Sequence, residues 1–167
     1  MPVDPDDYRR AVSRFVTGVT VVTTVTEGGH FALTANSFTS VSLEPVLVLV
    51  GVQKSSRFHA EVLAAGVWGI SVLGADMRAA SRFFASQDRY DAADPFDGWP
   101  CEKGAETNVM LLAGAIATFE CRTVLAYEGG DHTLLLGEVL ALDTTHPDAE
   151  PLLYYGGRYH GLGEPSD

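Results

Sequence analysis

Residues 31–52 read FALTANSFTSVSLEPVLVLVGV, and this stretch does most to decide the fold. Its second half, Val46–Val52 after Pro45, is a run of Val and Leu that predicts a buried β-strand. Its first half carries hydroxyl and amide groups in a segment too apolar for a solvated linker, so these groups need partners in the fold or in a ligand. They are Thr34, Asn36, Ser37, Thr39, Ser40 and Ser42. Together they favour a ligand rich in carbonyls and ring nitrogens.

Strand patterns surround this stretch in the sequence. A segment dense in Val and Thr precedes the Gly-Gly turn at residues 27–30, and extended character resumes after it, which together predict a β-hairpin. Residues 128–131 form a second turn that resembles the first and predicts another hairpin. A shorter apolar segment between the two hairpins predicts one more strand. The expected strands are Val19–Val25, Phe31–Ala35, Val46–Val52, Trp68–Leu73, Ala113–Tyr127 and Thr133–Leu142.

Helix signals precede and separate these strands. Asp4 supplies an N-cap oxygen and Pro5 a suitable first helical residue, while Ser55 or Ser56 can cap a second helix and Asp76 a third. The expected spans are Asp4–Gly18, Ser55–Gly66 and Asp76–Phe84. The polar segment Ser86–Asn108 is expected to be a long loop that covers a site or contacts a second subunit.

Five or six strands with short helices between them, and without regular βαβ alternation, favour a closed or partly closed antiparallel barrel over a Rossmann fold. Neither Gly-Gly pair belongs to a Gly-x-Gly-x-x-Gly motif that opens a helix, so the usual dinucleotide fingerprint is missing. The length of 167 residues is most simply explained by a single domain, residues 1–167.

The charge of the chain narrows the choice of partners. A formal net charge of -11 argues against nucleic acid or an anionic membrane as the main partner. A phosphate-bearing ligand would have to depend on local cations and backbone amides, and the candidate cations are Lys54, Arg57 and Arg82.

Targeting signals and cysteines add two further expectations. No apolar run approaches the roughly 20 residues that span a bilayer, and residues 1–7 are acidic where a signal peptide would be basic, so we expect a cytoplasmic protein. Cys101 and Cys121 form no disulfide framework or zinc-site pattern, and both are interpreted as structural thiols.

Motifs for hydrolysis or metal chemistry are weak. The five histidines show no metal-ligand spacing, so no metal site is expected, and no Gly-x-Ser-x-Gly elbow marks a nucleophile. With these classes disfavoured, we expect a reaction in which side chains contribute little general acid or base catalysis. Hydride transfer through a bound flavin is the leading example, because the ring system does the difficult part and the protein orients it.

An ordered set of motifs resembles the flavin reductase domain family, the small reductase components of two-component flavin-dependent monooxygenases. The resemblance covers residues 14–162, and the ordered set of motifs is more specific than any single motif. The matching segments are Thr34–Ser42 with the strand after Pro45, Lys54–Ser56, Arg82–Ala85, Gly104, Leu112–Cys121, Gly130–His132, Gly137–Val139, Pro151–Tyr155 and Tyr159.

The resemblance implies a mainly β fold, an antiparallel split β-barrel of the Greek-key, FMN-binding type, in a homodimer. It implies FMN or FAD as the flavin and NADH or NADPH as the hydride source. The reduced flavin would be released to a separate monooxygenase component, with no nucleic acid and no membrane as partner.

The resemblance also implies site residues. Thr34, Ala35, Asn36, Ser37, Ser40, Val41 and Ser42 would line the flavin ring and ribityl chain. Lys54, Ser55, Ser56 and Arg82 would meet the phosphate, the two serines at a helix start that favours an anion. Asp131 and His132 would lie beside the rings, with His132 positioning the nicotinamide. Apart from the resemblance, the aromatic surface and the one cation of Tyr155, Arg158 and Tyr159 would suit a nicotinamide or adenine.

Plainer roles stay open for several of these residues. Ser55 and Ser56 can serve only as helix caps, His132 as an exposed turn residue, and the C-terminal aromatic residues as barrel closure or dimer packing. Two other functions also stay open: a split-barrel flavoprotein oxidase that retains its flavin, and a non-catalytic flavin carrier. Ala32, Val46 and Gly51 depart from the pattern common in the family, which obscures the flavin preference.

Overall fold

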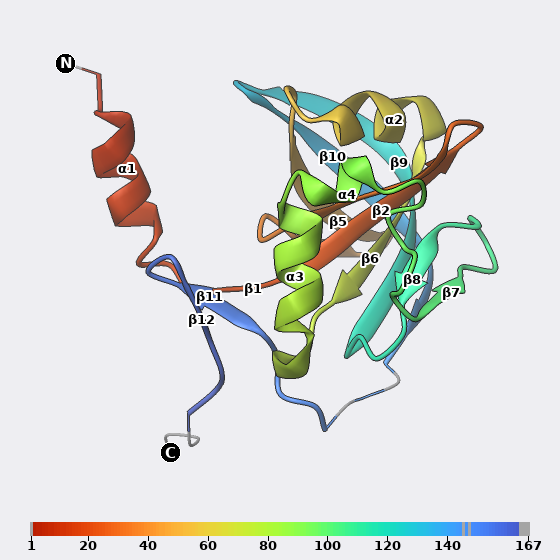
Figure 1. Cartoon of the computed structure of the whole chain (residues 1–167). Helices are drawn as coiled ribbons and strands as arrows, with labels where there is room; N and C mark the ends of the chain where they lie inside the picture. The colour runs from red at the N-terminus through yellow and green to blue at the C-terminus, as the bar shows by residue number, and fades with distance from the viewer. Residues whose placement is uncertain (1, 145, 147, 164–167) are drawn as a thin grey trace.

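The computed structural model describes residues 2–144, 146 and 148–163. Its largest unit is a seven-stranded antiparallel sheet with the strand order β3-β2-β6-β9-β10-β5-β4. The sheet curls so that β3 and β5 approach each other, which gives the expected mainly β, antiparallel split barrel (Figure 1). The strands are β2 Thr20–Thr26, β3 Gly29–Ala35, β4 Thr39–Leu43, β5 Val46–Gln53, β6 Val67–Val72, β9 Ala117–Gly129 and β10 His132–Asp143.

Smaller elements surround the barrel. In Figure 1, helix α1 stands apart from the barrel beside the β11–β12 hairpin, while α2 lies across the top and α3 runs along the front. The helices are α1 Pro5–Val12, α2 Arg57–Ala65, the 3₁₀ turn η1 Ala75–Met77, α3 Arg78–Ala85 and α4 Asp88–Asp91. Two small sheets contain β1 Thr17–Gly18, β11 Leu153–Tyr155 and β12 Arg158–His160, and β7 Cys101–Lys103 with β8 Met110–Leu112.

Two apolar cores stabilise this arrangement. The barrel core contains Val50, Trp68 and Leu135, and Phe58 of α2 reaches into it. The second core, which includes Phe84, joins the sheet to α3. Burial of one such side chain contributes about 1.5–3 kcal/mol. The two cores therefore fix the places of α2 and α3 against the sheet.

The first predicted helix is too long at its C-terminal end. Asp4 caps α1 as expected, accepting hydrogen bonds from the backbone N–H groups of Asp6 and Asp7, but the helix ends at Val12 rather than at Gly18. The cause is tertiary: Thr17 and Gly18 form β1, which pairs with β11 from the other end of the chain. The apolar side chains at positions 15 and 16 therefore lie outside the helix and are exposed.

The third predicted helix starts later than expected. Asp76 is not its N-cap but lies in η1, and α3 begins at Arg78. The chain is held extended at Gly74 by a bridge to Pro151, and the N–H of Ala75 donates to the carbonyl of Glu150. These long-range contacts fix the extended entry to the helix.

The segments predicted as connections contain further strands. The hydroxyl-rich segment includes β4, which pairs with β5, and the loop expected at 86–108 contains α4 and β7. The estimate of five or six strands was therefore too low. β4 lies at the edge of the sheet and is largely exposed, so its sequence lacks the apolar pattern of a buried strand.

The two cysteines give a testable consequence of the packing. Burial raises the pKa of Cys121, in the barrel core, to about 12, and burial together with the charge of Asp94 raises the pKa of Cys101 to about 11. Because the thiolate is the reactive form, we expect neither thiol of the native protein to react rapidly with DTNB in mildly alkaline buffer. Both should react at once after denaturation. Rapid labelling of one thiol in the native protein would contradict this packing.

Candidate functional site

The hydroxyl-rich segment Thr34–Ser42 is hydrogen-bonded to the end of β5 through Ser37. Its hydroxyl accepts a hydrogen bond from the N–H of Gly51 at 3.1 Å and donates one to the carbonyl of Gly51 at 2.9 Å. The pairing of β4 with β5 ends at Leu49. Beyond this residue, the side chain of Ser37 hydrogen-bonds to the backbone edge of β5 in place of β4. Gly51 adds no side chain of its own, which leaves a shallow recess beside Ser37.

Strand register places His132 on the same face of the sheet as this recess. Gly51 pairs with Leu134, and Gln53 pairs with His132. Paired residues share a face, and residues two apart in a strand also share one. The intervening residues of β5 and β10, Val52 and Thr133, point into the barrel and are buried. Ser37, Gly51 and His132 therefore border one outer face of the barrel.

The β9–β10 turn brings three predicted residues together. The backbone N–H of Lys54 donates to the carbonyl of Asp131 at 2.9 Å, and the carboxylate of Asp131 lies 2.8 Å from Nδ1 of His132. Lys54 pairs with the carboxylate of Glu128. The hydrogen bond and charge of Lys54 lower the pKa of Glu128, and those of His132 lower the pKa of Asp131. A carboxylate accepts only from a protonated Nδ1, so in the neutral form of the ring the bond leaves Nε2 of His132 as the acceptor for a ligand.

The start of α2 is open to an anion. Ser56 is the N-cap residue, but its hydroxyl donates to the carbonyl of Gln53 at 2.8 Å and makes no capping bond. The first turn of α2 therefore keeps its positive end free of a side-chain acceptor. Ser55 directly precedes this turn. The structure thus disfavours a role for these two serines as side-chain caps alone.

An apolar groove of about 890 Å³ extends between α1 and the barrel. Asn36 and Ser37 contribute to its wall, as do Phe38 and Thr39 at the approach to β4. Tyr8 and Val12 of α1 form part of the opposite wall. Two of the residues expected to line the flavin therefore border a groove large enough for a ring system.

A second pocket, of about 420 Å³, is lined by three arginines. Arg82 and Arg158, both predicted from the sequence, lie there with Arg78, and the lining contains Tyr154, Gly157 and Tyr159 but no carboxylate. The guanidinium carbons of Arg78 and Arg82 each lie 5.8 Å from the ring centroid of Tyr159. Arg82 therefore shares a pocket with Arg158 and not with the Lys54–Ser56 turn. Arg78 was not predicted; its spacing of four residues from Arg82 on one helix was the available signal.

Other predicted residues are engaged within the fold. The hydroxyl of Thr34 donates to the carbonyl of Ser81 at 2.7 Å, and the carbonyl of buried Ala35 accepts from Thr20. The hydroxyl of Ser42 accepts from the N–H of Glu44, and that of Tyr155 from Arg14. Thr34 therefore satisfies a backbone carbonyl, which is the plainer role that the sequence also allowed for it. The predicted Ser40 and Val41 lie on β4 and are exposed.

Two features of the described residues bear on other functions. No group of three or more His, Cys, Asp or Glu side chains in residues 2–144, 146 and 148–163 is placed to hold a metal ion. Over the same residues, no helix is long and apolar enough to cross a membrane.

Comparisons with known proteins identify the family of the chain. A family described as "Flavin reductase like domain" matches residues 12–163. The chain is 44% identical to an NADH-dependent FAD reductase of Streptomyces globisporus, over 99% of this chain and 91% of the relative. It is 41% identical to an NADH-dependent FMN reductase of Agrobacterium fabrum, over 91% of this chain and 83% of the relative.

Solved structures show the same fold. The Streptomyces globisporus NADH:FAD oxidoreductase, in complex with NAD and FAD fragments, superposes with a TM-score of 0.90 at 41% identity, over 100% of this chain and 99% of the other. The flavin reductase component of a bacterial two-component tryptophan halogenase superposes with a TM-score of 0.90 at 39% identity, covering 97% and 100%.

Proposed function

Because the chain belongs to the flavin reductase like domain family, we propose that the outer face bordered by Ser37, Gly51 and His132 is where NADH meets the flavin ring. The protein is an NADH-dependent flavin reductase that reduces FAD or FMN. The reduced flavin serves the second component of a two-component monooxygenase. The observation that supports the proposed face is the strand register, which puts the recess at Gly51 and the ring of His132 on the same side of β5 and β10.

The residues present fit a flavin nucleotide. Gly51 leaves the recess without a side chain, and the side chains of Leu134 and Ser37 each lie 3.6 Å from where a Cβ of Gly51 would be, so an apolar and a polar side chain border it. Asn36 offers an amide to the polar edge of a ring, and the uncapped start of α2 suits a phosphate. Lys54 adds a cation beside that helix start.

The reaction passes a hydride from C4 of the nicotinamide to N5 of the flavin, and this chemistry belongs to the two nucleotides. The contribution of the chain is geometric. Asp131 fixes the ring of His132 so that Nε2 accepts a hydrogen bond from the carboxamide N–H of the nicotinamide. That bond would orient the nicotinamide toward the flavin ring, because hydride transfer needs the two reacting atoms within roughly 3–3.5 Å of each other. His132 is a positioning residue, and no proton transfer from it is needed.

We also propose that the arginine pocket binds the phosphates of NADH. The pocket is lined by Arg78, Arg82 and Arg158 and by no carboxylate. The protein as a whole has a net charge of -11, so the charge of this pocket is opposite in sign to that of the protein. Tyr159 supplies an aromatic wall under two of the three guanidinium groups.

Replacing Arg82 or Arg158 with glutamine is expected to raise KM for NADH by about tenfold, with little change in kcat, because one charge-assisted phosphate contact is lost. Steady-state kinetics at several salt concentrations measures this effect, and the variants should depend less on salt than the wild type. Lys103→Gln removes the same charge from exposed β7 and should leave both parameters unchanged. An equal rise in KM for NADH in Lys103→Gln would show that the effect comes from the net charge of the protein, and it would contradict the proposed phosphate site.

A homodimer is the third part of the proposal. The outer face of the sheet continues from His132 across large apolar side chains, including Leu125 at 51% exposure and Tyr127 at 47%. Helix α1 has no buried residue, although Tyr8 and Val12 lie on it. A second copy of the chain would cover both surfaces. Since the apolar face adjoins His132, the partner copy would also border the proposed site.

The experiment that tests the function follows NADH oxidation by flavin-free protein with FAD, with FMN, and without flavin. Turnover that requires added flavin supports the reductase acting on exchangeable flavin. A flavin that stays bound and turns over with another reductant would instead support the retained-flavin oxidase. Binding of flavin without NADH oxidation would support the carrier and contradict the proposal.

A further inference from the structure

Helix α2 is joined to β10 by a side-chain hydrogen bond that the proposed function does not use. Nε2 of half-buried His59, in the first turn of α2, lies 2.8 Å from the hydroxyl oxygen of Thr133. Thr133 is 5% exposed, and it directly follows His132 in β10. The bond therefore acts on the residue next to the one that is proposed to place the nicotinamide.

One short segment after β5 holds the β9–β10 turn on both sides of His132. Before His132, the carbonyl of Asp131 accepts a hydrogen bond from the backbone N–H of Lys54 at 2.9 Å. After it, the hydroxyl of Thr133 is bonded to the ring of His59. A shift of this segment relative to β10 would therefore change the direction in which the ring of His132 points.

The backbone between β5 and His59 is tied by two hydrogen-bonded turns. Gln53 pairs with His132, and its carbonyl accepts from the N–H of Ser56 at 3.1 Å. The carbonyl of Ser56 in turn accepts from the N–H of His59 at 3.1 Å. The side chain of His59 is therefore presented to Thr133 from a backbone whose place relative to His132 is already fixed.

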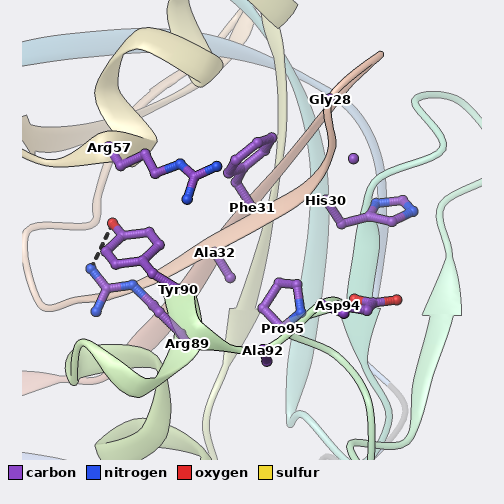
Figure 2. A pocket seen from close by; sticks show the side chains of 12 residues that line it. Gly28, His30, Phe31, Ala32, Arg57, Arg89, Tyr90, Ala92, Asp94 and Pro95 are labelled. Carbon is purple, nitrogen blue, oxygen red and sulfur yellow. Dashed lines mark hydrogen bonds between the residues drawn. The ribbon is translucent and has the colours of Figure 1, made fainter.

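Arg57 holds the same turn of α2 on its other side. Its guanidinium carbon lies 5.6 Å from the ring centroid of Phe31 and 5.8 Å from that of Tyr90, and Figure 2 shows the guanidinium between the two rings. Residues two apart in a helix point in nearly opposite directions, because each residue turns the helix by about 100°. The first turn of α2 is therefore held against β3 by Arg57 and against β10 by His59.

We propose that His59 is a positioning residue for the reductase reaction, because its bond to Thr133 fixes the direction of the neighbouring His132 ring. The inference rests on the proposed function, in which His132 places the nicotinamide. Either atom of the bond can be the donor, since a neutral imidazole has one donor and one acceptor nitrogen. His59 acts through β10 and not by contact with a nucleotide.

The test compares His59→Ala with Thr133→Val, which removes the hydroxyl with little change in volume. Each variant should lower the single-turnover rate of flavin reduction about fivefold, with the Kd for flavin within about twofold of wild type, because looser alignment affects the transfer step more than binding. The double variant should lose no more than either single variant, since both changes remove the same bond. His59→Gln keeps a hydrogen-bonding group at a similar reach and should recover most of the rate.

Glu61→Ala is the matched control on the same helix. Glu61 accepts a hydrogen bond from the hydroxyl of Thr26 at 3.0 Å, so this variant also removes a bond between α2 and the sheet, but to β2, which does not pair with β10. Its rate should equal that of the wild type. In a His132→Ala background, His59→Ala should cause no further loss. An unchanged rate in His59→Ala, an equal loss in Glu61→Ala, or a loss that persists without the His132 ring would overturn the inference.

The imidazole signals of His132 in proton–nitrogen correlation spectra give a second readout that does not depend on NADH oxidation. We expect these signals to shift or broaden in His59→Ala and Thr133→Val and to stay in place in Glu61→Ala. Unchanged signals in the first two variants would overturn the inference. If His132→Ala keeps the wild-type rate, the proposed function has failed, and the spectra still decide whether His59 positions the ring.

Discussion

Replacing His132 with alanine is expected to lower kcat/KM for NADH by about 100-fold, because small losses of alignment between the reacting atoms carry penalties of this size. The side chain hydrogen-bonds to Asp131, next to it in the sequence, and is 42% exposed, so its removal should not disturb the barrel. The Kd for flavin should stay within about twofold of the wild-type value, since the flavin is placed by other contacts.

His132→Gln and His146→Ala are the matched variants for this experiment. Glutamine keeps an acceptor at the same position and should recover part of the lost kcat. His146 is exposed and lies outside every pocket described above, so its replacement should leave the kinetics unchanged. A loss in His132→Ala that appeared only as weaker flavin binding would contradict the role of His132 in placing the nicotinamide.

Replacing Leu125 with aspartate is expected to raise the dimer dissociation constant by about 100-fold or more. Leu125 pairs with Leu136 on the outer face of the sheet, and two-fold symmetry would bring the new carboxylate into the interface twice. Sedimentation velocity over a dilution series measures the change. Lys103→Gln is the control on a different element. A wild-type protein that sediments as a stable monomer at micromolar concentration would contradict the homodimer itself.

Loss of the dimer should also lower the activity if the partner copy borders the site. The face that carries Leu125 adjoins the turn at His132, so a monomeric variant would expose the nicotinamide position to water. An active monomer with wild-type kcat/KM would separate the two parts of the proposal and leave the site within one chain.

The parts of the fold that were predictable from the sequence depend on local patterns. The start of α1 follows from the Asp4 carboxylate and Pro5, and the β2–β3 hairpin follows from a run of Val and Thr that leads into a Gly-Gly turn. Gly66 ends α2 in the left-handed conformation, as expected for a glycine at this position. Such features depend on a few neighbouring residues, so the sequence contains the information directly.

The parts that were missed depend on contacts between distant segments. The end of α1 is set by the pairing of β1 with β11, more than 130 residues away in sequence, for example between Thr17 and Tyr154. The same applies to the site. Arg78 and Arg82 share a helix, but their convergence with Arg158 requires the β11–β12 hairpin to lie beside that helix.

The residues of the turn around His132 were predictable from the sequence, but their hydrogen-bond partners in β5 and after it were not. Gly-Asp-His was recognised by resemblance, whereas the bond from Lys54 to the carbonyl of Asp131 depends on the register between β5 and β10. That register also decides which side chains of the two strands face outward. A shift by one residue would turn His132 to the opposite face of the sheet from Gly51.

The most direct test of the central claim is an anaerobic single-turnover measurement of flavin bleaching, with NADH and with NADH deuterated at the transferred position. Flavin is supplied at a concentration that saturates both wild type and His132→Ala. The account predicts one flavin reduced per NADH, a slower rate with deuterium, and a rate in His132→Ala that is lower by about 100-fold. Absence of bleaching in the wild type would contradict the reductase function, and an unchanged rate in the variant would contradict the placement of the nicotinamide beside His132.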